Sequence, residues 1–172
     1  MPPPRATASM TGLSALRGIV LALACTLSAA PAAGEETEMV VATGTFEVNM
    51  TPADAADEQD GVALGRFALD KRFAGGLSGT STGALLTANS ATEGSAGYVA
   101  MERFVGSLDG RSGAFVLQHS GTMQSGTQRL SITIVPDSGT GELAGVAGHM
   151  DLQIDGGVHA YELHYVIESE ND

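Results

Sequence analysis

Apolar and polar residues alternate one by one along most of the chain after residue 39. Successive side chains of an extended strand point to opposite faces, so this alternation is typical of strands with one buried and one wet face. None of the segments shows the spacing of an amphipathic helix, and only the acidic loop 51–61 has room for a short one. The alternating segments are residues 39–50, 62–73, 77–88, 97–108, 111–121, 128–135, 143–155 and 158–167.

The Asp109-Gly110 dipeptide marks the clearest hairpin in the chain. Both residues tolerate the positive φ angles that a two-residue turn requires, and such a turn pairs Phe104 with Phe115. A four-residue loop would shift the partners by one step but leave the same side chains on one face. That face carries Tyr98, Glu102, Phe104, Phe115, Leu117 and His119.

Turns predicted at residues 125–126 and 156–157 extend this apolar face to the later strands. The first turn places Ile132 opposite His119, in the middle of the face. The residues that the second turn adds are His159, Tyr161, Leu163 and Tyr165.

Eight antiparallel strands with one buried face close most simply into an up-and-down barrel, which leaves no exposed edge. We therefore predict an all-β domain over residues 40–167, built as an eight-stranded antiparallel up-and-down barrel. A two-sheet sandwich is the competing arrangement. The interior of such a barrel is filled by side chains or holds one small ligand.

Residues 1–33 have the features of a secretory signal peptide. Arg17 precedes the apolar run 19–25, and small residues at 30–32 suit signal peptidase. The run is too short to span a bilayer, so the sequence predicts no membrane span and export to the periplasm or the medium. Met10 is an alternative start to Met1. Residues 34–39 are predicted to form an acidic tether, and residues 168–172 a charged tail.

Cys25 is the single cysteine of the chain. Lipid attachment there is disfavoured because Ala22 stands where an aliphatic residue is expected. If the leader is removed, the mature chain contains no cysteine, which excludes disulfides, thiol catalysis and cysteine–metal sites.

The chain is strongly acidic, with a net charge of −12. Loss of the leader removes Arg5 and Arg17, so that 6 basic residues remain against 20 acidic ones and the net charge becomes −14. A surface of this sign repels nucleic acid and anionic lipid, which excludes nucleic-acid binding. A homodimer is compatible with the sequence.

The inward face carries the ionisable residues Lys71, Glu102 and His119 together with His159, Tyr161 and Tyr165. A carboxylate beside an imidazole in an apolar lumen is suited to proton transfer, so Lys71, Glu102 and His119 are the candidate catalytic residues. The alternative is that they only neutralise one another, because a buried charge requires a partner. The residues predicted to bind a ligand are Tyr98, Phe104, Phe115, Leu117, Ile132, Tyr161 and Tyr165.

A second polar group is predicted on the outer face of the last hairpin. The register places His149 opposite His164 and Asp151 opposite Glu162. Two imidazoles and two carboxylates suit a divalent metal, but a solvated polar face explains the same pattern. The sequence therefore assigns no metal and no cofactor.

Five stretches of the chain carry a family resemblance, namely residues 42–48, 69–71, 94–100, 110–123 and 135–145. Together they resemble the uncharacterised bacterial family known as domain of unknown function 3224. The resemblance covers most of residues 41–167, and the segment 118–121 is its most specific part. The resemblance implies a barrel similar to that of allene oxide cyclase, an enzyme that cyclises an apolar epoxide in its lumen, and it supplies no catalytic residues.

Three functions fit these observations. The first is an exported barrel that binds a small apolar or amphipathic molecule in its lumen, as a carrier or sequestering protein. The second is a cofactor-independent isomerase, cyclase or lyase that uses Glu102, His119 and Lys71. The third is a structural protein whose barrel is filled by side chains.

Overall fold

The structure is a computed structural model, and it describes residues 38–168. The expected leader 1–33, including Cys25, lies outside the described residues, as do positions 34–37 of the tether and 169–172 of the tail. Residues 38–168 form strands, turns and bends and contain no helix, which confirms the all-β prediction. This part of the chain accordingly has no helix long and apolar enough to cross a membrane.

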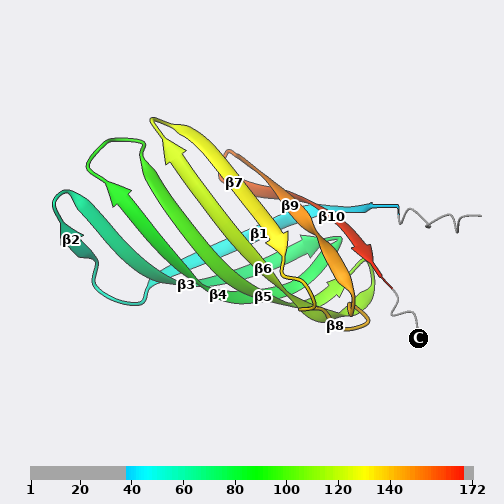
Figure 1. Ribbon diagram of the computed structural model, residues 1–172. Helices are drawn as coiled ribbons and strands as arrows, with labels where there is room; N and C mark the ends of the chain where they lie inside the picture. Colours follow the sequence, from blue (N-terminus) through cyan, green and yellow to red (C-terminus); the bar gives the residue numbers. More distant parts are fainter. Residues whose placement is uncertain (1–37, 169–172) are drawn as a thin grey trace, which may run out of the picture. The chain divides into compact units, whose positions relative to one another are not determined.

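Eight long strands and two short ones make up the described chain, and Figure 1 shows how they wrap around a common interior. The strands are β1 (Val40–Pro52), β2 (Asp57–Gln59), β3 (Val62–Gly75), β4 (Leu77–Ser90), β5 (Ala96–Leu108), β6 (Arg111–Gln124), β7 (Thr127–Ile134), β8 (Thr140–Gly141), β9 (Val146–Asp155) and β10 (Val158–Ile167).

The eight long strands close into an antiparallel barrel in the order β1-β10-β9-β7-β6-β5-β4-β3, and β3 pairs back onto β1. Strand β1 makes this closure because it has two partners. Its residues 40–46 pair with β10, and its residues 44–52 pair with β3. The prediction of a barrel is thus confirmed, and the sandwich is excluded.

The predicted register of the central hairpin is confirmed. Asp109 and Gly110 have φ angles of 48° and 86°, as the two-residue turn requires. Phe104 therefore pairs with Phe115. The two later turns are confirmed as well, because Ile132 pairs with His119 and the 156–157 turn joins β9 to β10 in the expected register.

Two segments differ from the prediction. The acidic loop 51–61 contains no helix; it contains β2, which a turn at residues 60–61 pairs with β3. Strand β9 begins at Val146 and not at Leu143. Residues 142–145 form turns after β8, and these turns carry the fully buried Leu143 into the core. Leu143 continues the apolar alternation of the sequence because it is buried in the core, although it lies in a turn and not in the strand.

Aromatic side chains fill one end of the barrel. The ring of Phe104 lies edge-on to Phe73 at 5.6 Å and beside Phe115 at 5.1 Å. The hydroxyl oxygen of Tyr161 accepts a hydrogen bond of 2.7 Å from the amide of Leu77, which satisfies a buried polar group. None of these five residues lines the apolar cavity at the candidate site.

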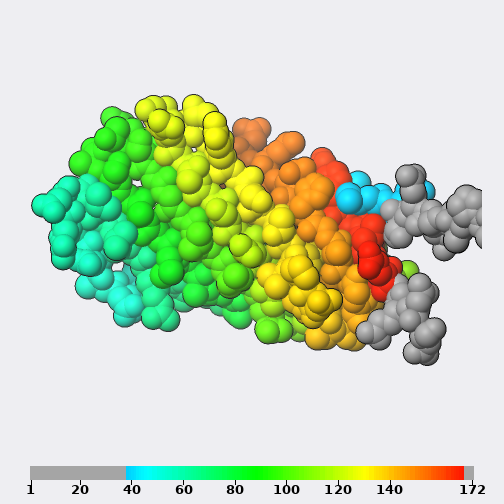
Figure 2. Space-filling view, in the orientation of Figure 1, coloured from blue at the N-terminus to red at the C-terminus, as the bar shows by residue number. Residues whose placement is uncertain are grey.

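Figure 2 shows the outer surface over β7 and β9, whose atoms (yellow and orange) lie side by side. Their pairing is the shortest between neighbouring long strands, since it consists of Thr133 opposite His149. Strands β6 and β7, in contrast, pair along residues 117–124 and 127–134. Among neighbouring long strands, β7 and β9 therefore have the least main-chain pairing in the wall of the barrel.

Candidate functional site

An apolar cavity of about 280 Å³ lies within the end of the barrel that the aromatic rings leave open. This volume is at the lower limit of the range typical of small-molecule sites. Its outer rim includes Met50 and Ile154, which are 54% and 57% exposed. The residues that line it are Phe46, Val48, Met50, Leu69, Lys71, Leu85, Tyr98, Ala100, His119, Gln128, Leu130, Leu152, Ile154 and His159.

Strand alternation brings three ionisable side chains together at the inner end of this cavity. Lys71 of β3 and His119 of β6 are 8% and 4% exposed, and both line the cavity. Glu102 of β5 is fully buried and lies behind them, outside the cavity lining. The predicted catalytic residues therefore do meet, but Glu102 does not face the cavity.

The Glu102 carboxylate is surrounded by donors. Lys71 Nζ donates a hydrogen bond of 2.7 Å to Oε2, and the hydroxyl of Ser81 donates to Oε1. His119 Nε2 lies 3.0 Å from Oε2, although it is not aligned for a hydrogen bond with any group in residues 38–168. The ammonium of Lys71 also lies 4.4 Å from the ring centre of Phe46, a favourable cation–π distance.

These contacts determine the charge of the cluster. Burial by itself raises the pKa of Glu102, but His119, Lys71 and Ser81 lower this pKa to about 2. Glu102 is therefore ionised at neutral pH and is a weak base. Its chemical role is to hold Lys71 and His119, so the groups that can touch a ligand are the ammonium and the imidazole.

Tyr98 is the one predicted ligand-binding residue that lines the cavity. Burial and then the negative charge of Glu102 raise the pKa of Tyr98, so its phenol stays protonated and can donate a hydrogen bond. His159 also reaches the cavity, where its ring stacks on Phe46 at 5.0 Å.

The remaining predicted ligand-binding residues lie outside the cavity lining. They were expected in an open lumen, but they pack against one another because aromatic rings and leucines fill that part of the barrel. These residues are Phe104, Phe115, Leu117, Ile132, Tyr161 and Tyr165.

Sequence reasoning missed Ser81 and most of the aliphatic wall. Ser81 occupies an inward position on β4, the strand of small residues, and its neighbour Gly83 pairs with Glu102. The inward alternation of β4 was a usable signal for Ser81, since a buried hydroxyl requires a partner. The wall residues that were missed include Val48, Leu69, Leu85, Ala100, Leu130 and Leu152.

The buried cluster is a poor metal site, because a lysine ammonium occupies one carboxylate oxygen of its single acid. In residues 38–168 the side chains close enough to hold a metal lie elsewhere, on β9 and β10.

Comparison with known proteins identifies relatives without a known activity. The family profile described as "Protein of unknown function (DUF3224)" matches residues 42–165. A crystal structure of a protein of unknown function from this family, from Shewanella oneidensis MR-1, is 50% identical in sequence, with a TM-score of 0.74. The similarity covers 77% of this chain and 99% of that chain. No curated protein matches.

Proposed function

Since the chain belongs to the DUF3224 family, whose description names no activity, we propose a function from the barrel itself. The cavity binds a small apolar or amphipathic molecule, and the protein carries or sequesters that molecule. The observation that carries this proposal is an apolar cavity of about 280 Å³ whose lining includes Lys71 and His119.

The walls of the cavity favour a hydrocarbon body. Aliphatic side chains from β1, β3, β4, β5, β7 and β9 surround the space, and each methylene group that a ligand buries there contributes about 0.8 kcal/mol. The exposed Met50 and Ile154 at the rim continue the apolar surface to solvent. A ligand can therefore enter with its apolar end in continuous contact with the wall.

The inner end of the cavity favours one polar group. An ammonium has three donors, and Glu102 accepts one hydrogen bond from Lys71. The opposite charges of Lys71 and Glu102 balance, so the ligand meets a polar surface with donors to spare and no net charge from this pair. A hydroxyl or carboxylate at the end of an alkyl chain fits this environment.

The test is competition with a fluorescent probe, 1-anilinonaphthalene-8-sulfonate, by decanoate and 1-decanol. Ala100 is 5% exposed and lines the cavity, so Ala100→Leu should fill the cavity and weaken binding at least about tenfold. Ala84→Leu is the matched control, because Ala84 lies on the exposed face of the neighbouring strand β4.

Equal binding by Ala100→Leu and the wild type would place the probe outside the cavity and contradict the proposal. If neither decanoate nor 1-decanol binds the wild type at about 1 mM, the result would favour a structural barrel that side chains fill.

A cofactor-independent isomerase, cyclase or lyase is the second function, and the contact between His119 and Glu102 favours it. His119 faces the cavity and would accept a proton from the ligand, while the ionised Glu102 would stabilise the resulting imidazolium. In this scheme Glu102 is a positioning residue, because its carboxylate lies 3.0 Å from His119 Nε2 and outside the cavity lining. Lys71 holds that carboxylate with a hydrogen bond of 2.7 Å.

The two functions differ in solvent exchange at the ligand. Protein purified with its natural ligand and transferred to D₂O should yield ligand deuterated at carbon only if the protein transfers a proton to or from that carbon. Loss of deuteration in His119→Gln, but not in His159→Gln, would establish the enzyme, since both histidines line the cavity. If the wild type yields ligand without this label, the result would contradict the enzyme and support the carrier function.

We also propose that the protein is exported, on the pattern of residues 1–33. Mass spectrometry of the periplasmic fraction should then give a chain that begins near Gly34. A chain that still begins at Met1 or Met10 would contradict export. A lipid on Cys25 would instead contradict cleavage near Gly34. The native mass of the same sample reports bound ligand and whether one or two chains assemble.

A further inference from the structure

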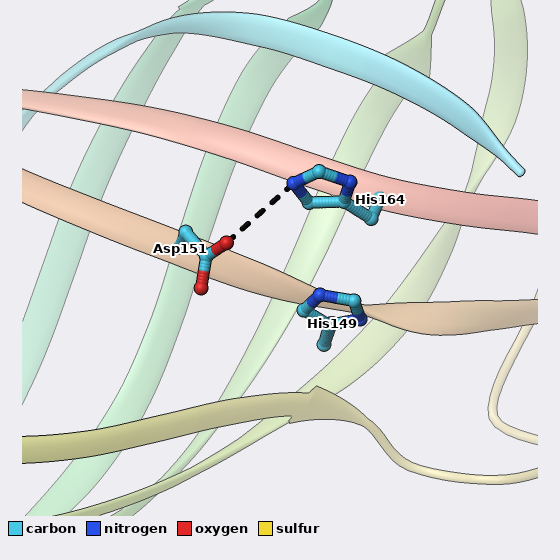
Figure 3. Close-up of side chains that lie close together, drawn as sticks. All are labelled: His149, Asp151 and His164. Atoms are coloured by element: carbon cyan, nitrogen blue, oxygen red, sulfur yellow. Dashed lines mark ion pairs between the residues drawn. The ribbon is translucent and has the colours of Figure 1, made fainter.

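Two histidines and two carboxylates form a cluster on the outer face of β9 and β10, and none of the four lines the cavity. His149 pairs with His164 across the two strands, and Asp151 pairs with Glu162. Figure 3 shows the side chains of His149, Asp151 and His164 on the same side of the two ribbons. The imidazole rings are stacked, with centres 4.8 Å apart and planes 4° from parallel.

The donor atoms of this cluster lie close together. His164 Nε2 lies 3.5 Å from Asp151 Oδ2 and 3.8 Å from Glu162 Oε2. One ligand atom each of His149, Asp151 and His164 lies within 4.8 Å of the other two. Ligands about 2.0–2.2 Å from a tetrahedral zinc ion are about 3.3 Å apart, so modest side-chain movements would complete the site.

The strands provide a fixed base, and the side chains remain free to adjust. Strands β9 and β10 pair along their whole length, which fixes the separation of the four Cα atoms. A metal ion lies in the plane of each imidazole that binds it, so the stacked rings must tilt toward each other. The side chains of Asp151 and Glu162 are 67% and 53% exposed, and that of His164 is 25% exposed, so solvent borders the space that this tilt requires.

The local charges favour a cation. Asp151 and Glu162 face each other directly, and like charges in such cross-strand pairs repel. The neighbours of the histidine pair in the same row are Val41 on β1 and Thr133 on β7, and neither is charged. A divalent ion would offset the repulsion without displacing a basic side chain of that row.

We propose that His149, His164 and Asp151 bind one divalent transition-metal ion such as Zn²⁺. Two imidazoles and a carboxylate are ligands that Zn²⁺ accepts, and Cu²⁺ binds such a set more tightly. The fourth position is open to Glu162 or to water. This site is independent of the cavity and of the ligand proposed for it.

Calorimetric titration of the untagged full chain with ZnCl₂ tests the site. We expect one ion per chain, and His149→Ala or His164→Ala should each weaken binding at least about tenfold, as loss of a ligand does. His159→Ala is the matched control, because His159 belongs to the same strand β10 but lines the cavity. It should bind Zn²⁺ like the wild type.

A second measurement does not depend on the folding of variants. Nitrogen NMR of the wild-type histidine rings should show Zn²⁺ shifting His149 and His164 and leaving His119 and His159 unchanged. A dissociation constant weaker than about 1 mM would overturn the proposal. So would Zn²⁺ binding that both alanine variants retain, or ring shifts at other histidines only.

Discussion

Glu102 is a fully buried carboxylate whose oxygens contact a lysine, a serine and a histidine. An isolated charge in such a place would be strongly unfavourable, and its partners reverse that preference. Sequence alternation predicted that Glu102, His119 and Lys71 share one face, since this depends only on spacing. Lys71 Nζ and His119 Nε2 both approach the same oxygen of Glu102. This convergence depends on where β3 and β6 lie relative to β5.

The low pKa of Glu102 predicts a loss of stability in acid. The pKa of the Glu102 carboxyl has its usual value of 4.5 in the unfolded chain and a value of about 2 in the folded protein. The folded state thus binds fewer protons in this window, so the stabilisation is complete above pH 4.5 and is lost as the pH falls toward 2. At 1.36 kcal/mol for each pH unit, the loss is about 3 kcal/mol. Urea denaturation between these pH values measures it.

The control for this prediction removes the ion pair without leaving one charge behind. Lys71→Met combined with Glu102→Leu keeps apolar volume in the barrel, and such replacements are often neutral or stabilising. Other carboxylates contribute equally to the acid sensitivity of both proteins. If the double variant loses as much stability in acid as the wild type, then Glu102 is not the group responsible.

At the scale of the strand, Gly83 permits the close approach of β4 to Glu102. A Cβ atom at Gly83 would overlap with the main-chain oxygen of Met101 and lie 2.9 Å from the Cα atom of Glu102. Gly97 on β5 has room, because the nearest atom to its added Cβ would be the main-chain oxygen of Gly121 at 3.7 Å. The two glycines therefore have different roles in neighbouring strands.

We expect Gly83→Ala to destabilise the barrel by roughly 2–3 kcal/mol, because main-chain atoms must shift to admit the methyl group. Gly97→Ala should change the free energy of unfolding by less than about 1 kcal/mol and is the matched control. Urea denaturation at neutral pH gives both values. Equal effects of the two substitutions would show that the spacing of β4 and β5 does not depend on Gly83.

At the scale of the whole barrel, closure is uneven. Strand β1 bridges β10 and β3 along its length, whereas β7 and β9 share the single pair Thr133 and His149. Regions with few main-chain hydrogen bonds open more readily than the rest of a fold. The wall between β7 and β9 is therefore the place where the barrel is expected to open first.

Hydrogen exchange measured residue by residue tests this expectation. The amides of β7 that point toward β9 should exchange at least about tenfold faster than those bonded to β6, on the same strand. Comparison within one strand controls for sequence and solvent exposure. Equal protection on the two sides of β7 would mean that the barrel opens only as a whole.

Local sequence determined the strands, the three two-residue turns and the set of residues that share the inner face. These features depend on alternation and on residues such as Asp109 and Gly110, which act over a few positions. Sequence also placed His149 opposite His164, because a turn type sets the register of its hairpin.

Tertiary structure alone decided how the interior is divided. Whether an inward side chain such as Phe104 or Tyr98 packs in the core or borders the cavity depends on how the side chains of all eight strands fill a common space, and no single segment carries that information. The bond from Ser81 to Glu102 likewise required β4 and β5 to lie side by side. The turns after β8 also set the start of β9. They bury Leu143 in the core, where it packs against apolar residues that are distant in sequence.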